Sequence, residues 1–283
     1  MIEMSEKQQH YFMDYKDSKI FFAYHPPAEN SRNGCGVLIC DPILEEKQDA
    51  HRAIVNFSNL LSDNGFGVLR FDFRGQGESN GDFNQFSPDD LFDDILLAIK
   101  ELKSKQGLSS VNVLSLRYGG NLAVKVLDNI DVNRLILWAP IYDCRSYAEM
   151  ILRSNLTTQL LKHRKVIENR AALVKKLSDG KTINIDGYEL NKLWYDHISN
   201  DSLSESIKTI KCKTTIMDIA FRPDKPNVKW DKFVKLIEDR PSIETIRVKG
   251  ENFWNLIPLY AVRPPELFGK TLDILKNDAD RQQ

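Results

Sequence analysis

The sequence predicts an α/β fold in which helices flank a mostly parallel central sheet, and three observations support this. Short apolar, β-branched runs alternate with longer amphipathic stretches, which is typical of β–α units around a parallel sheet. Hydrophobic residues make up 42% and aromatic residues 10% of the 283 residues, enough for one continuous core. Between residues 143 and 209 the alternation stops, which indicates an insertion between two strands.

Strands are predicted where β-branched and apolar residues cluster between turn signals. The first of these runs ends before Pro26 and Pro27, which cannot continue a hydrogen-bonded ladder. The third is followed by a glycine-rich turn at Gly75, Gly77 and Gly81. In chain order, the strands are predicted at residues 19–24, 36–40, 68–73, 111–116, 134–139, 214–218 and 243–248.

Helices are predicted between these strands, where apolar residues recur at steps of three and four. Ile54, Phe57 and Leu61 share one face of the first helix, which Gly65 ends. In chain order, the helices are predicted at residues 51–64, 89–103, 119–127 and 267–275. Residues 143–209 are expected to be all-helical, residues 1–142 and 210–276 to form the core, and residues 277–283 to be a flexible tail.

Composition excludes several classes of partner. The 39 basic and 40 acidic side chains nearly cancel, so no one-signed field favours nucleic acid or a membrane surface. No apolar run approaches the roughly 20 residues that span a bilayer, and the first ten residues lack the apolar segment of a signal peptide. The four cysteines show neither CxxC pairing nor zinc-ligand spacing, so a cytoplasmic protein with reduced thiols and no metal is expected.

Residues 111–123 have the form of a strand, a sharp turn and a helix. Nucleophile elbows of the form GxSxG need small residues at both ends of the motif, because backbone and helix approach closely there. Ser115 and Gly119 occupy these two positions, and Arg117 occupies the central position where the nucleophile would stand. Ser115 itself lies two residues too early to be the nucleophile, and Cys40 is interpreted as a small core residue rather than a substitute.

With this motif and the run at residues 68–79, Val-Leu-Arg-Phe-Asp-Phe-Arg-Gly-Gln-Gly-Glu-Ser, the chain resembles the α/β-hydrolase superfamily, in its serine-aminopeptidase-like branch. It resembles more closely the hydrolase-like proteins associated with exosortase and exopolysaccharide loci. That resemblance is carried by residues 42–46 (Pro-Ile-Leu-Glu-Glu), residues 186–190 and the pair Phe253 and Trp254. It implies an α/β-hydrolase fold in which residues 143–209 are a helical lid, and a link to surface-polysaccharide systems.

The remaining catalytic positions are also altered. The acid position falls at Asp218 or Asp224, and the histidine position falls at Asn252. No histidine follows His197, and an asparagine has no titratable proton and cannot act as a general base. We therefore expect a degenerate triad and no confident catalytic residue.

The position of Arg117 leaves two interpretations open. An arginine at a helix N-terminus is repelled by roughly 0.3–1 kcal/mol, so a negative group must compensate. The compensating group is either an internal carboxylate, from Glu45, Glu46 or Asp72, or an anionic ligand held by the guanidinium and the elbow amides.

The leading functional hypothesis is a pseudoenzyme that binds a small acyl, glycan-linked or anionic ligand, or a protein partner, in the old active-site cleft. The alternatives are an atypical hydrolase or acyltransferase-like enzyme in which Arg117 polarises a carbonyl, and a purely structural protein that docks through its lid. No cofactor is expected, because one Gly-x-Gly at Gly75 is too weak a nucleotide signal. The candidate ligand-binding residues are Ile43, Glu45, Arg117, Tyr118, Asn252 and Trp254.

Overall fold

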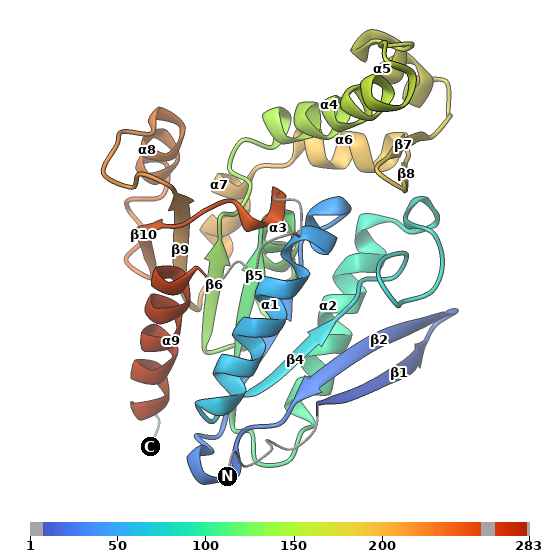
Figure 1. The fold of residues 1–283 in the computed structure, drawn as a ribbon. Coiled ribbons are helices and arrows are strands. Elements are labelled where there is room, and N and C mark those ends of the chain that lie inside the picture. Colours follow the sequence, from blue (N-terminus) through green and yellow to red (C-terminus); the bar gives the residue numbers. More distant parts are fainter. Residues whose placement is uncertain (1–7, 256–263, 282–283) are drawn as a thin grey trace.

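The chain folds around an eight-stranded sheet that is parallel apart from its first two strands (Figure 1). The structure is a computed structural model and describes residues 8–255 and 264–281. The strand order is β1-β2-β4-β3-β5-β6-β9-β10, with β2 antiparallel to both of its neighbours. The strands are β1 (Gln9–Tyr15), β2 (Ser18–His25), β3 (Cys35–Cys40), β4 (Gly67–Phe71), β5 (Ser110–Leu116), β6 (Arg134–Trp138), β9 (Lys213–Ala220) and β10 (Ile243–Lys249).

Helices cover both faces of the central strands, which explains why those strands are apolar along their whole length. All six residues of β3 and all five of β4 are buried, as expected for parallel strands packed on both sides. Helices α1 (Glu45–Asp63) and α9 (Pro265–Asp280) lie on one face, and α2 (Pro88–Lys103) and α3 (Tyr118–Val126) on the other (Figure 1). The predicted α/β architecture is therefore confirmed.

The segment between β6 and β9 lies over the carboxyl-terminal edge of the sheet (Figure 1). The prediction that it is all-helical was wrong, because it also contains a two-stranded hairpin. Asp186 and Gly187, both with positive φ, form the tight turn that an Asp-Gly pair favours. The elements are α4 (Cys144–His163), α5 (Arg170–Ser178), β7 (Ile183–Ile185), β8 (Tyr188–Leu190), α6 (Lys192–Asn200) and α7 (Leu203–Ser206).

Other elements differ from the sequence prediction. Strand β1 and helix α8 (Val228–Lys235) were not predicted, and α1 begins at Glu45, six residues before the predicted start. Helix α9 continues through residues 277–280, which were expected to be tail, since Asp278 and Ala279 are buried. Within residues 8–255 and 264–281, no helix is long and apolar enough to cross a membrane.

Asp278→Asn tests whether the end of α9 is part of the folded core. The Asp278 carboxylate accepts hydrogen bonds from Nε and Nη2 of Arg134, and both side chains are largely buried. Breaking such a pair should lower the free energy of unfolding by about 3 kcal/mol, measured by urea denaturation. Asp280→Asn, at the exposed end of the same helix, is the control and should unfold like the wild type. Equal stability of all three proteins would contradict the assignment.

Candidate functional site

Strand β5 runs into helix α3 through a strained turn at Arg117. The backbone of Arg117 has φ 54° and ψ −132°, a conformation that costs a non-glycine residue about 1–3 kcal/mol. Its amide N–H donates to Trp138 O at 3.0 Å, and its carbonyl accepts from the Gly120 N–H at 3.0 Å. The structure thus places the Arg117 side chain at the tip of an elbow.

The two small residues of the motif explain how the elbow fits against the neighbouring strand β3. A Cβ added at Gly119 would lie 2.2 Å from Asp41 O, so only glycine fits there. Ser115 is fully buried, and its hydroxyl donates to Cys40 O at 3.1 Å. Its side chain therefore points into the sheet and away from the tip.

The Arg117 guanidinium is paired inside the protein. Nε and Nη2 donate to Glu46 Oε1 at 3.0 and 2.9 Å, and Nη1 donates to Ala139 O at 3.2 Å. The hydroxyl of Tyr147 donates to the other oxygen of Glu46 at 2.9 Å. The rings of Tyr147 and Trp254 lie 5.5 and 4.9 Å from the guanidinium carbon. All three nitrogens of the guanidinium are therefore satisfied by the described chain.

The position of helix α1 determines which of the three candidate carboxylates pairs with Arg117. Glu46 lies in its first turn, where a negative charge is favoured by the exposed backbone N–H groups. Asp72 is instead paired with Lys47, whose Nζ lies 2.7 Å from Oδ1. Burial and the neighbouring Asp186 raise the pKa of Glu45 to about 7. Glu46 thus supplies the charge that offsets an arginine at the N-terminus of α3.

The two acid candidates have partners other than an imidazole. Asp218, at the end of β9, accepts a hydrogen bond from Arg247 Nε at 2.9 Å. Asp224 is exposed and pairs with Arg222 at 3.2 Å. Asn252 is exposed in the loop after β10, just before a short 3-10 turn (Phe253–Asn255). None of these contacts links an acid to a base.

The last histidine of the sequence, His197, lies in the inserted segment. It is half-buried on α6 and packs against Trp194 and Tyr118, with ring centroids 5.9 and 6.5 Å away. Tyr118 is itself fully buried below the elbow and stacks on Tyr147. Burial lowers the pKa of His197, so its ring is neutral at pH 7.

A cavity of about 420 Å³ lies beside the elbow, between the start of α1 and the inserted segment. Two of the candidate ligand-binding residues, Ile43 and Glu45, line it. Arg117, Tyr118, Asn252 and Trp254 are not among its described lining residues. Glu46 and Tyr147, which contact Arg117, do line it. None of the lining residues that come from the insertion was predicted to bind a ligand, and they include Tyr147, Met150, Ile151, Ile185 and Asp186. The available signals were the helical spacing of α4 and the Asp186–Gly187 pair.

The cavity wall can hold apolar groups. No nucleophilic side chain stands at the elbow tip, and the nearby carboxylates are those of Glu45, Glu46 and Asp186. Within the part of the chain that the structure describes, no group of three or more His, Cys, Asp or Glu side chains could hold a metal ion. The site is therefore defined by the geometry of the elbow and by the Arg117–Glu46 pair.

This architecture, with a strained elbow after the central strand, is that of the α/β hydrolases. The sequence profile of the family described as "Serine aminopeptidase, S33" matches residues 48–215, more than half of the chain. The chain therefore belongs to the serine aminopeptidase S33 family. No curated protein matches it at the level of sequence.

Solved structures share the fold at low sequence identity. Est1E from Butyrivibrio proteoclasticus, solved with ferulic acid, has a TM-score of 0.65 at 15% identity, covering 96% of this chain and 99% of its own. A proline iminopeptidase from Mycobacterium smegmatis has a TM-score of 0.63 at 13% identity, covering 97% and 100%. An esterase from Pyrococcus furiosus has a TM-score of 0.64 at 15% identity, covering 96% and 91%.

Gly119→Ala tests the close approach at the elbow. The new methyl group would overlap the Asp41 carbonyl, and overpacking against backbone should lower the free energy of unfolding by about 3 kcal/mol. Gly269→Ala is the matched control, because its Cβ meets nothing within 4 Å on helix α9. That change should raise stability by up to about 1 kcal/mol. Urea denaturation measures both, and equal effects would refute the close approach.

Glu45→Gln tests the carboxylate beside the insertion through its pH dependence. In the unfolded chain a glutamate has a pKa of about 4.3, whereas Glu45 in the fold has a pKa of about 7. The folded state then keeps a proton that the unfolded state releases, so wild-type stability falls as pH rises from about 4.5 to 7. The variant lacks this loss, and its melting temperature should exceed that of the wild type increasingly over this window. A pH-independent difference would contradict the assignment.

Proposed function

We propose that this chain is a non-hydrolytic member of its family, which binds a ligand or a partner through the cleft beside the elbow. The observation that carries the proposal is Arg117 at the elbow tip, hydrogen-bonded to Glu46 through two nitrogens. A guanidinium stays protonated in proteins and donates hydrogen bonds only, so it cannot attack a carbonyl carbon. The nucleophile position is therefore used for an internal ion pair.

The surrounding positions support the same proposal. Asn252 stands where the family pattern has histidine, and Asp218 is held by Arg247 rather than by an imidazole. Losing a nucleophile or its base alone costs a triad several powers of ten in rate, and here both are replaced. The degenerate triad is part of the proposal, with Arg117, Asp218 or Asp224, and Asn252 at its three positions.

The chemistry of the 420 Å³ cavity favours an acyl group as the ligand. Its wall is largely apolar, with Ile43 and Leu44 from one side and apolar residues of the insertion from the other. An anionic ligand is less well matched, because Arg117 is already neutralised and the carboxylates of Glu45, Glu46 and Asp186 outnumber the one lining arginine of the described chain, Arg153. We propose residues 143–209 as the lid over this cavity, with the exposed Leu161 available to a protein partner.

The proposed link to surface-polysaccharide or exosortase systems rests on sequence resemblance. The Pro42–Glu46 segment contains the partner of Arg117, and Trp254 covers the guanidinium, so the motifs shared with exosortase- and exopolysaccharide-associated proteins surround the altered elbow. We propose that the chain serves a surface-polysaccharide or exosortase system from the cytoplasm. Cys40, Cys144 and Cys212 are free thiols, which fits a reducing compartment.

A second candidate is an atypical hydrolase or acyltransferase-like enzyme. Backbone strain favours this candidate, because a protein without catalytic function would not need it. Arg117 and Leu44 both have positive φ, at 54° and 59°. Strained backbone at this place is typical of catalytic sites, where elbow and loop amides stabilise a developing oxyanion. Arg117 would then hold or polarise an acyl or carboxylate substrate.

Hydrolysis of short-chain p-nitrophenyl esters and labelling by a fluorophosphonate probe test the proposal. We expect the wild type to show neither, and Arg117→Ser to show neither, because Asn252 supplies no base for a new serine. A serine-bearing esterase of the same fold is the positive control. Labelling of the wild type would overturn the proposal. Turnover without labelling, lost in Arg117→Met, would instead establish the second candidate.

A further inference from the structure

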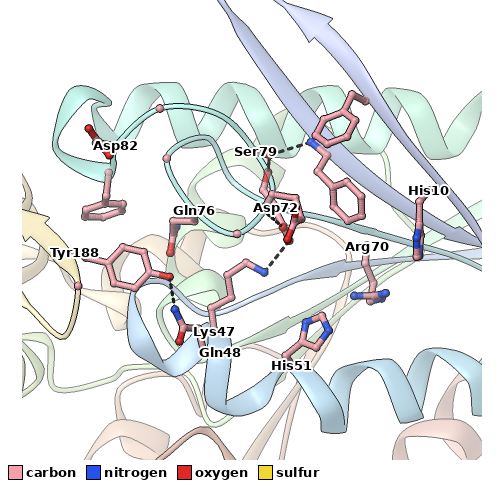
Figure 2. A pocket seen from close by; sticks show the side chains of 18 of the residues that line it. His10, Lys47, Gln48, His51, Arg70, Asp72, Gln76, Ser79, Asp82 and Tyr188 are labelled. Carbon is pink, nitrogen blue, oxygen red and sulfur yellow. Dashed lines mark hydrogen bonds and ion pairs between the residues drawn. The ribbon is translucent and has the colours of Figure 1, made fainter.

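A second, larger cavity of about 1050 Å³ lies on the far side of the start of α1 from the elbow. Lys47, Gln48 and His51 of α1 line it, together with Arg70 and Asp72 of the β4 region (Figure 2). The proposed function uses none of these side chains. Asp186, in the turn of the β7–β8 hairpin, is the one described residue that lines both cavities.

The cavity exists because the edge of the sheet is left uncovered. Helix α1 packs over β3 and β4, whereas β1 and β2 extend beyond it (Figure 1). The pairing aligns His10 of β1, Ala23 of β2 and Arg70 of β4 in one row on this face. Phe12 and Phe21 form the next row, with ring centroids 5.4 Å apart. Phe12 is 54% exposed, so this aromatic floor is open.

Arg70 is buried, and its guanidinium is hydrogen-bonded to His25. It is 5% exposed, and its Nε donates to His25 Nε2 at 3.2 Å. Burial and the charge of Arg70 lower the pKa of His25 to about 4, so the ring is neutral and its Nδ1–H donates to Asn59 Oδ1 at 3.0 Å. This chain of hydrogen bonds fixes the guanidinium through Nε. Within the described residues, neither Nη has a hydrogen-bond or ion-pair partner.

Two buried carboxylates in this region, those of Asp41 and Asp72, share one cation, Lys47, and also act electrostatically on Arg70. Lys47 Nζ lies 2.7 Å from Asp72 Oδ1 and 3.4 Å from Asp41 Oδ2, and all three side chains are buried. Gln76 adds an unsatisfied buried donor, since its Nε2 is buried without a partner in the described chain while its Oε1 accepts from the Leu44 N–H at 2.7 Å. Unsatisfied buried donors of this kind are costly and call for an explanation.

We propose that this cavity is a binding site for an organic carboxylate. The carboxylate would pair with the Nη atoms of Arg70, beside His51 and His10 (Figure 2). Its apolar body would lie on Phe12 and Phe21, which also line the cavity. A guanidinium presents two parallel N–H groups that match a carboxylate. One guanidinium, in a cavity that is also lined by the carboxylates of Asp72, Glu78, Asp82, Asp186 and Glu189, suits a monoanion better than a doubly charged phosphate, and the aromatic floor suits an organic molecule. This site is separate from the cleft of the proposed function.

The test is isothermal titration of the full chain with benzoate and, separately, with inorganic phosphate. We expect saturable benzoate binding that Arg70→Met abolishes, and weaker binding of phosphate. His51→Ala and Phe12→Ala alter exposed side chains and should weaken benzoate binding about tenfold without changing the melting temperature. Arg52→Ala is the matched control, because Arg52 is exposed on the same turn of α1 and does not line the cavity.

Absence of benzoate binding at millimolar concentration overturns the proposal, as does unchanged binding in a folded Arg70→Met variant. Should that variant not fold, unchanged binding in both His51→Ala and Phe12→Ala overturns it instead. Phosphate binding as tight as benzoate overturns the assignment to a carboxylate, and loss of binding in Arg52→Ala overturns the placement in this cavity.

Discussion

The pair between Arg117 and Glu46 is the interaction on which the elbow depends. A guanidinium stands at a strained turn, at the positive end of α3, with side-chain exposures of 14% and 12% for the two partners. Leaving such a charge unpaired would be expensive, so a carboxylate must meet it. Glu46 does so from the opposite helix, and Tyr147 and Trp254 close over the pair. The altered elbow is thus a complete structural unit.

The start of α1 links the two cavities. Successive residues of a helix point about 100° apart, so neighbouring side chains serve different surroundings. Glu45 faces the cavity beside the insertion, Glu46 neutralises Arg117, and Lys47 forms ion pairs with Asp41 and Asp72 on the other side. Lys47 makes the close contacts with those carboxylates, so within the described residues the Nη atoms of Arg70 form no hydrogen bond or ion pair with them. One helical turn therefore sets the charge balance of both sites.

The sequence predicted the layers of the fold and the elbow, because both rest on local patterns. Apolar parallel strands and the spacing from Ser115 to Gly119 are visible without tertiary information. The choice of Glu46 over Glu45 and Asp72 was not predictable, since it depends on where α1 begins. That helix was expected to start at residue 51, which left both glutamates in a loop.

The second cavity was missed for a similar reason. This cavity requires β1, in which the alternation of polar and apolar residues is broken by the exposed Phe12. It also requires that no helix cover β1 and β2. The available signal was Arg70 inside an otherwise apolar strand, since a charge at a buried position needs a partner. The hairpin in the insertion had a signal too, the Asp186–Gly187 pair.

A double-mutant cycle on Arg117→Met and Glu46→Gln tests the central claim most directly. The quantity to measure is the coupling free energy in urea denaturation, from the wild type, the two single variants and the double variant. The account predicts that each single change costs about 3 kcal/mol and that the double variant costs less than their sum by about 1–3 kcal/mol. Strictly additive losses would show that Arg117 is not paired with Glu46 and would contradict the account.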